Sequence, residues 1–295
     1  MDASPAPAAA PGSSGDPRGG TATVDTPLLS LRGVTKRFGA VQALTDVDLD
    51  VPAGMVTALA GDNGAGKSVT IKTISGLWRP DEGEILWNGQ VVDIANPDDA
   101  ADLGITTVYQ DLALCDNLDI VQNMFLGHEL LRGRALDEDT MEKRARATLA
   151  DLSVTTVRSV RQPVASLSGG QRQSVAVAKA VMANSKLVIL DEPTAALGVA
   201  QTRMVLDLVR RLADRGVAVL LISHNLNDVF AVADRVAVLY LGRMVVEAPL
   251  SDFDTQSVVD YMTIGRSERA TPDRRAAPNG AGSAADRPPT GEGAK

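Results

Sequence analysis

The segment 61–68, GDNGAGKS, has residue types and a spacing that suit the binding of a phosphate chain. Its three glycines let the backbone curl so that N–H groups point inward, and the helix start after them adds partial positive charge. Lys67 can reach the β- and γ-phosphates of a nucleotide, and the Ser68 hydroxyl can bind Mg²⁺. A glycine-rich turn with a chance lysine is the alternative interpretation. The residues expected to contact the nucleotide here are Gly61, Asp62, Asn63, Gly64, Ala65, Gly66, Lys67, Ser68 and Val69.

A second candidate segment, LVILDEP at 187–193, places two acids at the end of an apolar run. Continuous branched apolar residues are typical of a strand buried on both faces, and ligands bind at the carboxyl ends of such strands. Asp191 is expected to hold Mg²⁺, and Glu192 to act as the base or water-orienting group for attack on the γ-phosphate. Taken alone, the segment could equally be an acidic loop after a strand.

A third segment, LSGGQ at 167–171, puts two adjacent glycines at the start of a stretch that otherwise favours a helix. Glycine inside a helix costs about 1 kcal/mol relative to alanine, so the pair needs a reason. Ser168, Gly169 and Gly170 offer bare backbone N–H groups and a hydroxyl at a helix start, which is a second anion site. A helix capped by serine is the alternative interpretation.

The elements that must position these segments alternate between strands and helices. Apolar, β-branched runs predict strands at 28–33, 55–60, 83–89, 105–110, 187–192, 218–223 and 236–241. Capping residues and apolar periodicity predict helices at 67–75, 96–104, 137–152 and 199–214. Such alternation predicts a parallel sheet covered by helices. Residues 111–180 show hardly any strand pattern, so they are expected to form a helical lobe.

Composition limits the possible functions. The 295 residues include 44% hydrophobic ones, enough for a large buried core, and the apolar runs are too short to span a membrane. The net charge of −8 disfavours a general nucleic-acid binder. The first residues have neither a basic start nor an apolar stretch, and Cys115 is the single cysteine, so a cytoplasmic location is expected. Residues 1–27 and 266–295 are expected to be disordered tails.

The three segments together resemble the motifs of the ATP-binding cassette (ABC) ATPases, with LSGGQ as the signature of that family. The resemblance covers about residues 28–265 and implies an α/β P-loop NTPase fold. That fold has a mostly parallel sheet, an N-terminal antiparallel portion and a helical subdomain at about 111–180. It also implies ATP and Mg²⁺ as ligands. Two subunits would join head to tail, so that residues 168–171 of one, Gln171 included, close on the ATP held by the other.

Three further residues fit the family one by one. Phe38 resembles the aromatic that stacks on adenine, although a core phenylalanine is the alternative. Gln110 resembles the residue that contacts Mg²⁺ or the attacking water at the junction with the helical lobe, although a solvated glutamine is possible. His224, after the strand at 218–223, resembles the histidine that hydrogen-bonds the γ-phosphate. The other histidine, His128, is expected to be a surface side chain.

One position departs from the family pattern. The family usually has aspartate where this chain has Gly198, which puts in doubt the communication between the two paired sites. The segments 123–127 and 222–243 resemble ATPases of bacterial sugar importers of the ribose, xylose and fructose type. Many members of that subgroup carry two cassettes, and this chain carries one. A homodimer or a second ATPase subunit, an integral-membrane permease and, indirectly, a sugar-binding protein are therefore the expected partners, with the chain on the inner face of the cell membrane.

Three other functions are weighed against sugar import. A soluble ABC ATPase acting on nucleic acid or ribosomes predicts a tandem cassette, a coiled-coil insertion or a basic surface, and the sequence shows none of these. Import of a solute other than a sugar requires no change in this subunit, because on this mechanism it never touches the solute. A nucleotide-dependent scaffold without useful hydrolysis rests only on Gly198.

Overall fold

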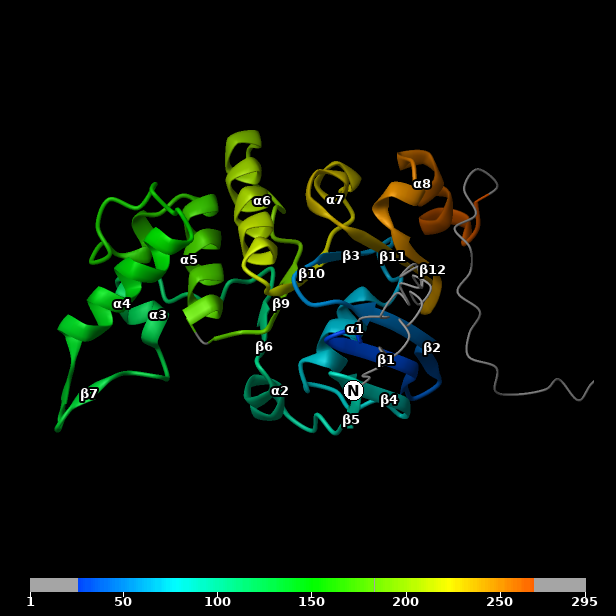
Figure 1. Ribbon diagram of the computed structural model, residues 1–295, viewed down its shortest axis with the longest axis horizontal. Coiled ribbons are helices and arrows are strands. Elements are labelled where there is room, and N and C mark those ends of the chain that lie inside the picture. The colour runs from blue at the N-terminus through cyan, green and yellow to red at the C-terminus, as the bar shows by residue number, and fades with distance from the viewer. Residues whose placement is uncertain (1–25, 183, 268–295) are drawn as a thin grey trace, which may run out of the picture.

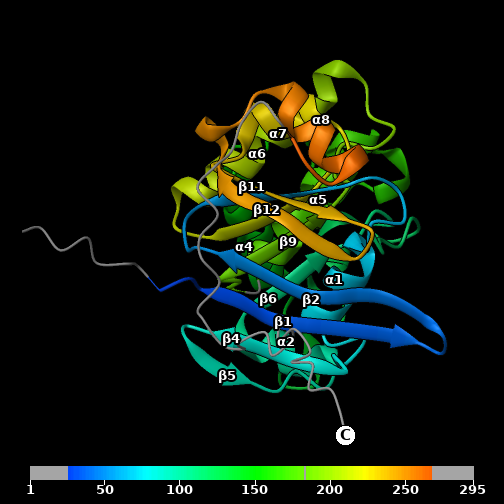
Figure 2. The same ribbon diagram turned by 90° about the vertical axis from the view of Figure 1, so that its right-hand side faces the viewer.

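The computed structural model describes residues 26–182 and 184–267. The tails expected over 1–27 and 266–295 lie outside the described residues, apart from the two innermost positions of each. Two sheets form the centre of the molecule, one mostly parallel and one antiparallel, and helices cover the parallel one (Figures 1 and 2). This is the α/β architecture that the alternating sequence pattern predicts.

The larger sheet has six strands in the order β12-β11-β3-β10-β9-β6. All pair in parallel except β12, which runs antiparallel to β11. Strands β3 and β10 are buried along their whole length, which explains their continuous apolar sequences. The bounds are β3 Val56–Ala60, β6 Ile105–Val108, β9 Leu187–Asp191, β10 Ala218–Ile222, β11 Arg235–Tyr240 and β12 Arg243–Pro249.

The smaller sheet is antiparallel, in the order β2-β1-β4-β5. Its strands are β1 Leu29–Phe38, β2 Val41–Val51, β4 Glu82–Trp87 and β5 Gln90–Val92. Helix α1 (Lys67–Ile74) belongs to the same hydrophobic cluster as this sheet, since Ile71 is fully buried with Leu31 of β1 and Leu59 of β3. The cluster holds α1, and with it the segment 61–68, in a fixed place between the two sheets.

Seven further α-helices follow in the part of the chain that the structure describes. They are α2 Pro97–Leu103, α3 Ile120–Phe125, α4 Glu138–Asp151, α5 Gly169–Met182, α6 Val199–Asp214, α7 Leu226–Val232 and α8 Thr255–Ile264. The expected helices at 96–104, 137–152 and 199–214 are present. Asn96 caps α2 by accepting hydrogen bonds from the backbone N–H of Asp98 and Asp99, and Gly104 ends it in a left-handed conformation.

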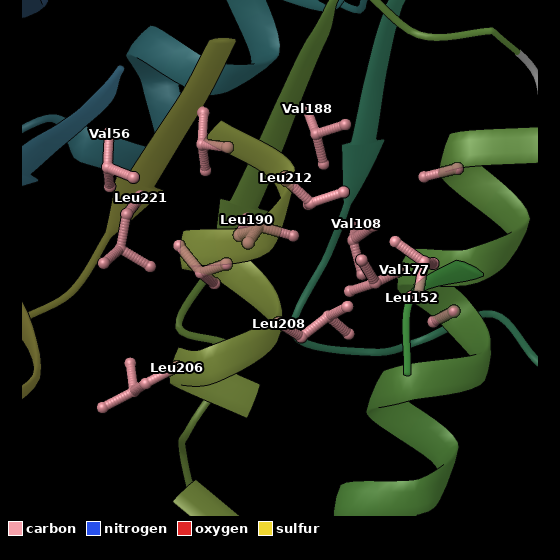
Figure 3. Packing of buried hydrophobic residues seen from close by; sticks show 14 of the residues in the cluster. Val56, Val108, Leu152, Val177, Val188, Leu190, Leu206, Leu208, Leu212 and Leu221 are labelled. Carbon is pink, nitrogen blue, oxygen red and sulfur yellow. The ribbon is translucent and has the colours of Figure 1, made fainter. Parts of the chain in front are cut away.

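A second hydrophobic cluster joins the parallel sheet to the helices beyond it. Leu190 of β9, Leu208 of α6 and Val177 of α5 are all buried in this cluster (Figure 3). It continues to Ile120 of α3 and Leu152 after α4. The helices α3, α4 and α5 therefore share one core with the sheet that carries the acidic segment.

The region 111–180 holds α3, α4 and most of α5, joined by long loops, and it lies at one end of the molecule (Figure 1). It also contains a short hairpin, β7 Leu131–Arg132 with β8 Ala135–Leu136, and a 3₁₀ turn at Val164–Ser166. The remaining 3₁₀ turn, Leu250–Asp252, precedes α8. The limits of the helical lobe as a separate subdomain stay a prediction.

Candidate nucleotide-binding site

The segment 61–68 connects β3 to α1, as its sequence predicts. Gly64 and Gly66 have positive φ angles of 81° and 108°, which residues other than glycine adopt only with strain. Gly66 is the N-cap of α1, so the helix begins at Lys67. The free N–H groups at this helix start form the positive end of the helix dipole, where a phosphate would be stabilised.

Lys67 is buried, with 8% of its surface exposed. Its ammonium group donates hydrogen bonds to the carbonyl oxygens of Gly61, at 2.7 Å, and Asp62, at 3.1 Å. The charge therefore lies beside the segment that the phosphates would contact. A buried ammonium held only by carbonyl groups keeps a strong preference for an anion.

A cavity of about 550 Å³ opens beside this segment. It brings together three parts of the chain that the sequence analysis identified separately, namely the glycine-rich segment, Gln110 and the acidic pair. Of the expected site residues, it is lined by Asn63, Gly64, Gly66, Lys67, Ser68, Val69, Gln110, Asp191 and Glu192. Gly61, Asp62 and Ala65 belong to the same segment but are not among the lining residues.

Asp191 and Glu192 stand at the carboxyl end of β9, where parallel strands present ligand-binding groups. Burial raises the pKa of the Asp191 carboxyl above its usual value, and the negative charge of Glu192 raises it further, while Lys67 opposes the shift. A cation at this position would reverse the cost of ionising Asp191. The two adjacent acids therefore repel each other, and a bound cation would offset that repulsion.

Glu192 and His224 form a hydrogen-bonded pair. Oε1 of Glu192 lies 2.7 Å from Nδ1 of His224 and accepts a second hydrogen bond, of 3.2 Å, from the His224 backbone N–H. The Glu192 side chain is 14% exposed and that of His224 is 60% exposed. The histidine therefore fixes the carboxylate on one side and extends into solvent on the other.

The donors expected for Mg²⁺ fit that ion. Ser68, Gln110 and Asp191 line the same cavity and offer oxygen atoms, the ligands that Mg²⁺ prefers. Mg²⁺ is usually held by one or two protein groups together with phosphates and water, so this sparse set is sufficient. Among residues 26–182 and 184–267, no group of three or more His, Cys, Asp or Glu is arranged to hold a metal ion.

Phe38 lies at the end of β1 and does not line the cavity, but its cross-strand partner Val41 does. Phe38 is 40% exposed, and its ring packs edge-on against Trp78 with 4.7 Å between ring centroids. The ammonium group of Lys36 lies 5.5 Å from the ring centroid. Phe38 is therefore a partly exposed aromatic beside the cavity and not a core residue.

The signature residues 168–171 span the start of α5, which begins at Gly169, and are not among the described residues that line the cavity. Ser168 and Gly169 are exposed, whereas Gly170 is buried. A Cβ atom on Gly169 would lie 2.9 Å from Leu197, and one on Gly170 would lie 2.9 Å from Gln201. The glycine pair thus has a reason that the sequence did not reveal, because it lets α5 pack closely on the start of α6.

Five lining residues were not expected from the sequence. They are Val41, Gln42 and Ala43 at the start of β2, and Leu241 and Gly242 in the turn after β11. Gly242 donates a backbone hydrogen bond of 2.9 Å to Ala65 and accepts one of 2.8 Å from Thr45, which joins this turn to the glycine-rich segment. The signal that could have identified the turn was Gly242 directly after the predicted strand at 236–241.

The remaining singled-out residues lie outside the cavity. Gly198 is exposed and is the N-cap of α6, with φ −74° and ψ 162°. His128 is exposed, as expected, and Cys115 is half-buried. Within the described ranges, no helix is long and apolar enough to span a bilayer.

Comparison with known proteins places this geometry in a family. The sequence model described as "ABC transporter" matches residues 44–195, just over half of the chain. The chain is 48% identical over 244 residues to the fructose import ATP-binding protein of Rhizobium meliloti, an alignment that covers 80% of this chain and 94% of the relative. It is 43% identical over 236 residues to a xylose/arabinose import ATP-binding protein of Sulfolobus acidocaldarius, with coverage of 80% and 94%.

A ribose import ATP-binding protein of Rubrobacter xylanophilus is 42% identical over 85% of this chain, which spans 50% of that longer relative. Among solved structures, a dimeric ATP-binding cassette bound to ADP and Pi is similar with a TM-score of 0.64 and 28% identity, covering 76% of this chain and all of that one. A nucleotide-free cassette gives a TM-score of 0.68 at 25% identity, with coverage of 75% and 91%. The chain therefore belongs to the ABC transporter family, and it is an ATP-binding ATPase of that family.

Proposed function

We propose that this ATPase powers the import of a sugar across the cytoplasmic membrane. The proposal is supported by the relatives named for fructose, xylose and ribose import, at 42–48% identity. It places the chain on the cytoplasmic face, bound to an integral-membrane permease that receives sugar from a binding protein. The alternative of an ATPase acting on nucleic acid gains no support from these relatives.

The observation that carries the proposed mechanism is that one cavity contains Lys67, Asp191 and Glu192, with His224 hydrogen-bonded to Glu192. Lys67 and the start of α1 bind the β- and γ-phosphates of ATP. Glu192 orients the attacking water and accepts its proton, while His224 holds the carboxylate in place. Ser68, Gln110 and Asp191 would hold Mg²⁺, which when bound neutralises charge on the phosphates.

The signature residues complete the site from a second subunit. Ser168 and Gly169 are exposed at the start of α5 and do not line this chain's own cavity, so they are available to another copy. In the proposed head-to-tail pair they cover the triphosphate held by the partner. ATP stabilises the closed pair and its hydrolysis releases it, which shifts the permease between two conformations. A second ATPase subunit of similar sequence could replace one copy.

Substitution of Glu192 tests the catalytic assignment. Glu192→Gln should keep ATP binding and lower kcat by roughly 10²- to 10⁴-fold, the usual contribution of a positioned base. The matched control is Glu84→Gln, which makes the same change at an exposed position of β4 and should leave turnover unchanged. Normal hydrolysis by Glu192→Gln would remove this residue from the role.

Substitution of Lys67 tests the phosphate site, because Lys67→Ala should weaken ATP binding and turnover together. Unchanged affinity would contradict the assignment.

A test of the substrate class requires the assembled transporter. Purification from the native membrane should bring a permease with this chain, and a sugar-loaded binding protein should stimulate ATP turnover of that complex. Stimulation only by a binding protein for another solute would contradict sugar import.

A further inference from the structure

The loop after Glu192 makes an unusual turn. Glu192 and Ala196 both have left-handed φ angles, 49° and 59°, although neither is a glycine. Such angles cost free energy and persist only where neighbouring contacts enforce them. Contacts with neighbouring residues must therefore hold the strained stretch 192–196 in place. The stretch begins at Glu192, whose carboxylate faces the nucleotide cavity.

One anchor lies two residues beyond Glu192. The hydroxyl of Thr194 donates a hydrogen bond of 2.5 Å to Oδ2 of Asp228. Asp228 is 4% exposed and lies in the first turn of α7, where the helix dipole favours a negative charge. A buried carboxylate without a hydrogen-bond partner destabilises the fold, so loss of this hydrogen bond should have a measurable cost in free energy.

The two hydrogen bonds join the same two segments side by side. Glu192 and Thr194 are two residues apart in the loop after β9, while His224, in the loop after β10, and Asp228, in the first turn of α7, are four residues apart. Glu192 pairs with His224, and Thr194 pairs with Asp228. The second pair thus fixes the backbone that carries one member of the first pair relative to the backbone that carries the other.

We propose that Thr194 and Asp228 are positioning residues for hydrolysis, because their hydrogen bond holds the Glu192 carboxylate against His224 and toward the cavity. Neither residue lines the cavity or is assigned to the nucleotide, so each acts through Glu192. The inference rests on the catalytic roles proposed for Glu192 and His224. Since a displacement of about 1 Å in a catalytic group can lower a rate by two orders of magnitude, the effect on turnover should exceed that on binding.

Removal of one hydroxyl tests the inference in the full-length chain. Thr194→Val keeps the shape of the side chain and should lower kcat by about ten- to a hundredfold. The KM for ATP and the Kd of a non-hydrolysable ATP analogue should change by less than about twofold, since the phosphate segment is untouched. Thr194→Ser restores the hydroxyl and should restore kcat.

A second variant separates positioning from stability. Asp228→Leu removes the acceptor and should lower kcat as much as Thr194→Val. The double variant leaves no unpaired polar group, so its thermal stability should exceed that of the less stable single variant, while kcat stays low. A structural role alone would instead restore kcat together with stability.

Each outcome bears on the inference. It is overturned by a Thr194→Val protein with wild-type kcat, by equal losses in Thr194→Val and Thr194→Ser, or by a loss of ATP affinity as large as that of kcat. If Thr194→Val does not fold, the comparison of Asp228→Leu with the double variant decides. Normal turnover in Glu192→Gln would instead refute the proposed function, so the two failures are distinguishable.

Discussion

The replacement of Gly198 by aspartate should stabilise the protein. Gly198 is the N-cap of α6, has the extended backbone conformation that N-cap residues adopt, and has open space where a Cβ atom would lie. No acidic residue occupies the first turn of this 16-residue helix. An aspartate can therefore accept hydrogen bonds from the free N–H groups and place a negative charge at the positive end of the helix dipole.

Three contributions set the size of the effect. Aspartate instead of glycine at an N-cap contributes a few tenths of a kcal/mol, and the charge near the helix start contributes about 0.3–1 kcal/mol. The loss of glycine's freedom in the unfolded chain contributes about 0.4–1 kcal/mol. The free energy of unfolding should therefore rise by about 1–2 kcal/mol, which corresponds to a Tm increase of roughly 2–4 °C at this chain length.

Thermal unfolding of the wild type, Gly198→Asp and Gly198→Asn measures these contributions. Asparagine supplies the cap without the charge, so its gain should be smaller than that of aspartate by about 0.3–1 kcal/mol. Basal ATP hydrolysis should stay within about twofold, because Gly198 does not line the nucleotide cavity. A lower Tm for Gly198→Asp, or an equal gain for asparagine at low salt, would refute the reasoning.

Three further substitutions test other parts of the structure. Gly61→Ala should lower ATP affinity at least roughly tenfold in a binding titration, because its Cβ would lie 2.5 Å from the carbonyl oxygen of Leu239 and the segment must shift. Asn123→Leu should lower the free energy of unfolding by about 2–4 kcal/mol in a denaturant titration, because this fully buried amide satisfies the backbone of the loop 115–119. Burial outweighs Arg235 and raises the pKa of Glu247. Wild type should therefore lose stability relative to Glu247→Gln as the pH rises from below glutamate's ordinary pKa through the raised one, and equal pH slopes would contradict this.

The phosphate segment and the acidic pair were predictable because each depends on a short stretch of sequence. One motif consists of glycines at fixed spacing before a lysine, and the other of two acids directly after an apolar run. Each can be interpreted without knowledge of the rest of the chain. The parallel sheet brings the ends of β3, β6 and β9 to one edge, so motifs far apart in the chain meet in one cavity. That meeting follows from strand order and not from the spacing of the motifs.

Strand β2 was missed because its alternation is interrupted. Leu44 is buried, and Val47, Leu49 and Val51 are buried alternately after it, but the register shifts along the pairing with β1 and Asp46 has a positive φ angle of 50°. Such an irregularity breaks the period of two on which the prediction of strands relies. For the same reason, the β2 residues that line the cavity were not predicted as site residues.

The contacts of Thr194 and of the glycine pair were not predictable for a different reason. Thr194 meets Asp228 only because β9 and β10 are neighbours in the sheet, and Gly169 meets Leu197 only because α5 packs on α6. Neither pair has a pattern in the sequence. Side chains that act through tertiary contacts are identified from the structure.

The most direct test of the proposed head-to-tail pair is the mass of the Glu192→Gln variant in saturating Mg-ATP, measured by sedimentation. The chain alone has a mass of 30.8 kDa, and the paired form should have about twice that mass. Adding Ser168→Arg places a large cation at the exposed start of α5, so that protein should still bind ATP and stay at the mass of one chain. Pairing of the double variant as tightly as Glu192→Gln would contradict the account, and so would a Glu192→Gln protein that pairs neither with itself nor with a second ATPase subunit.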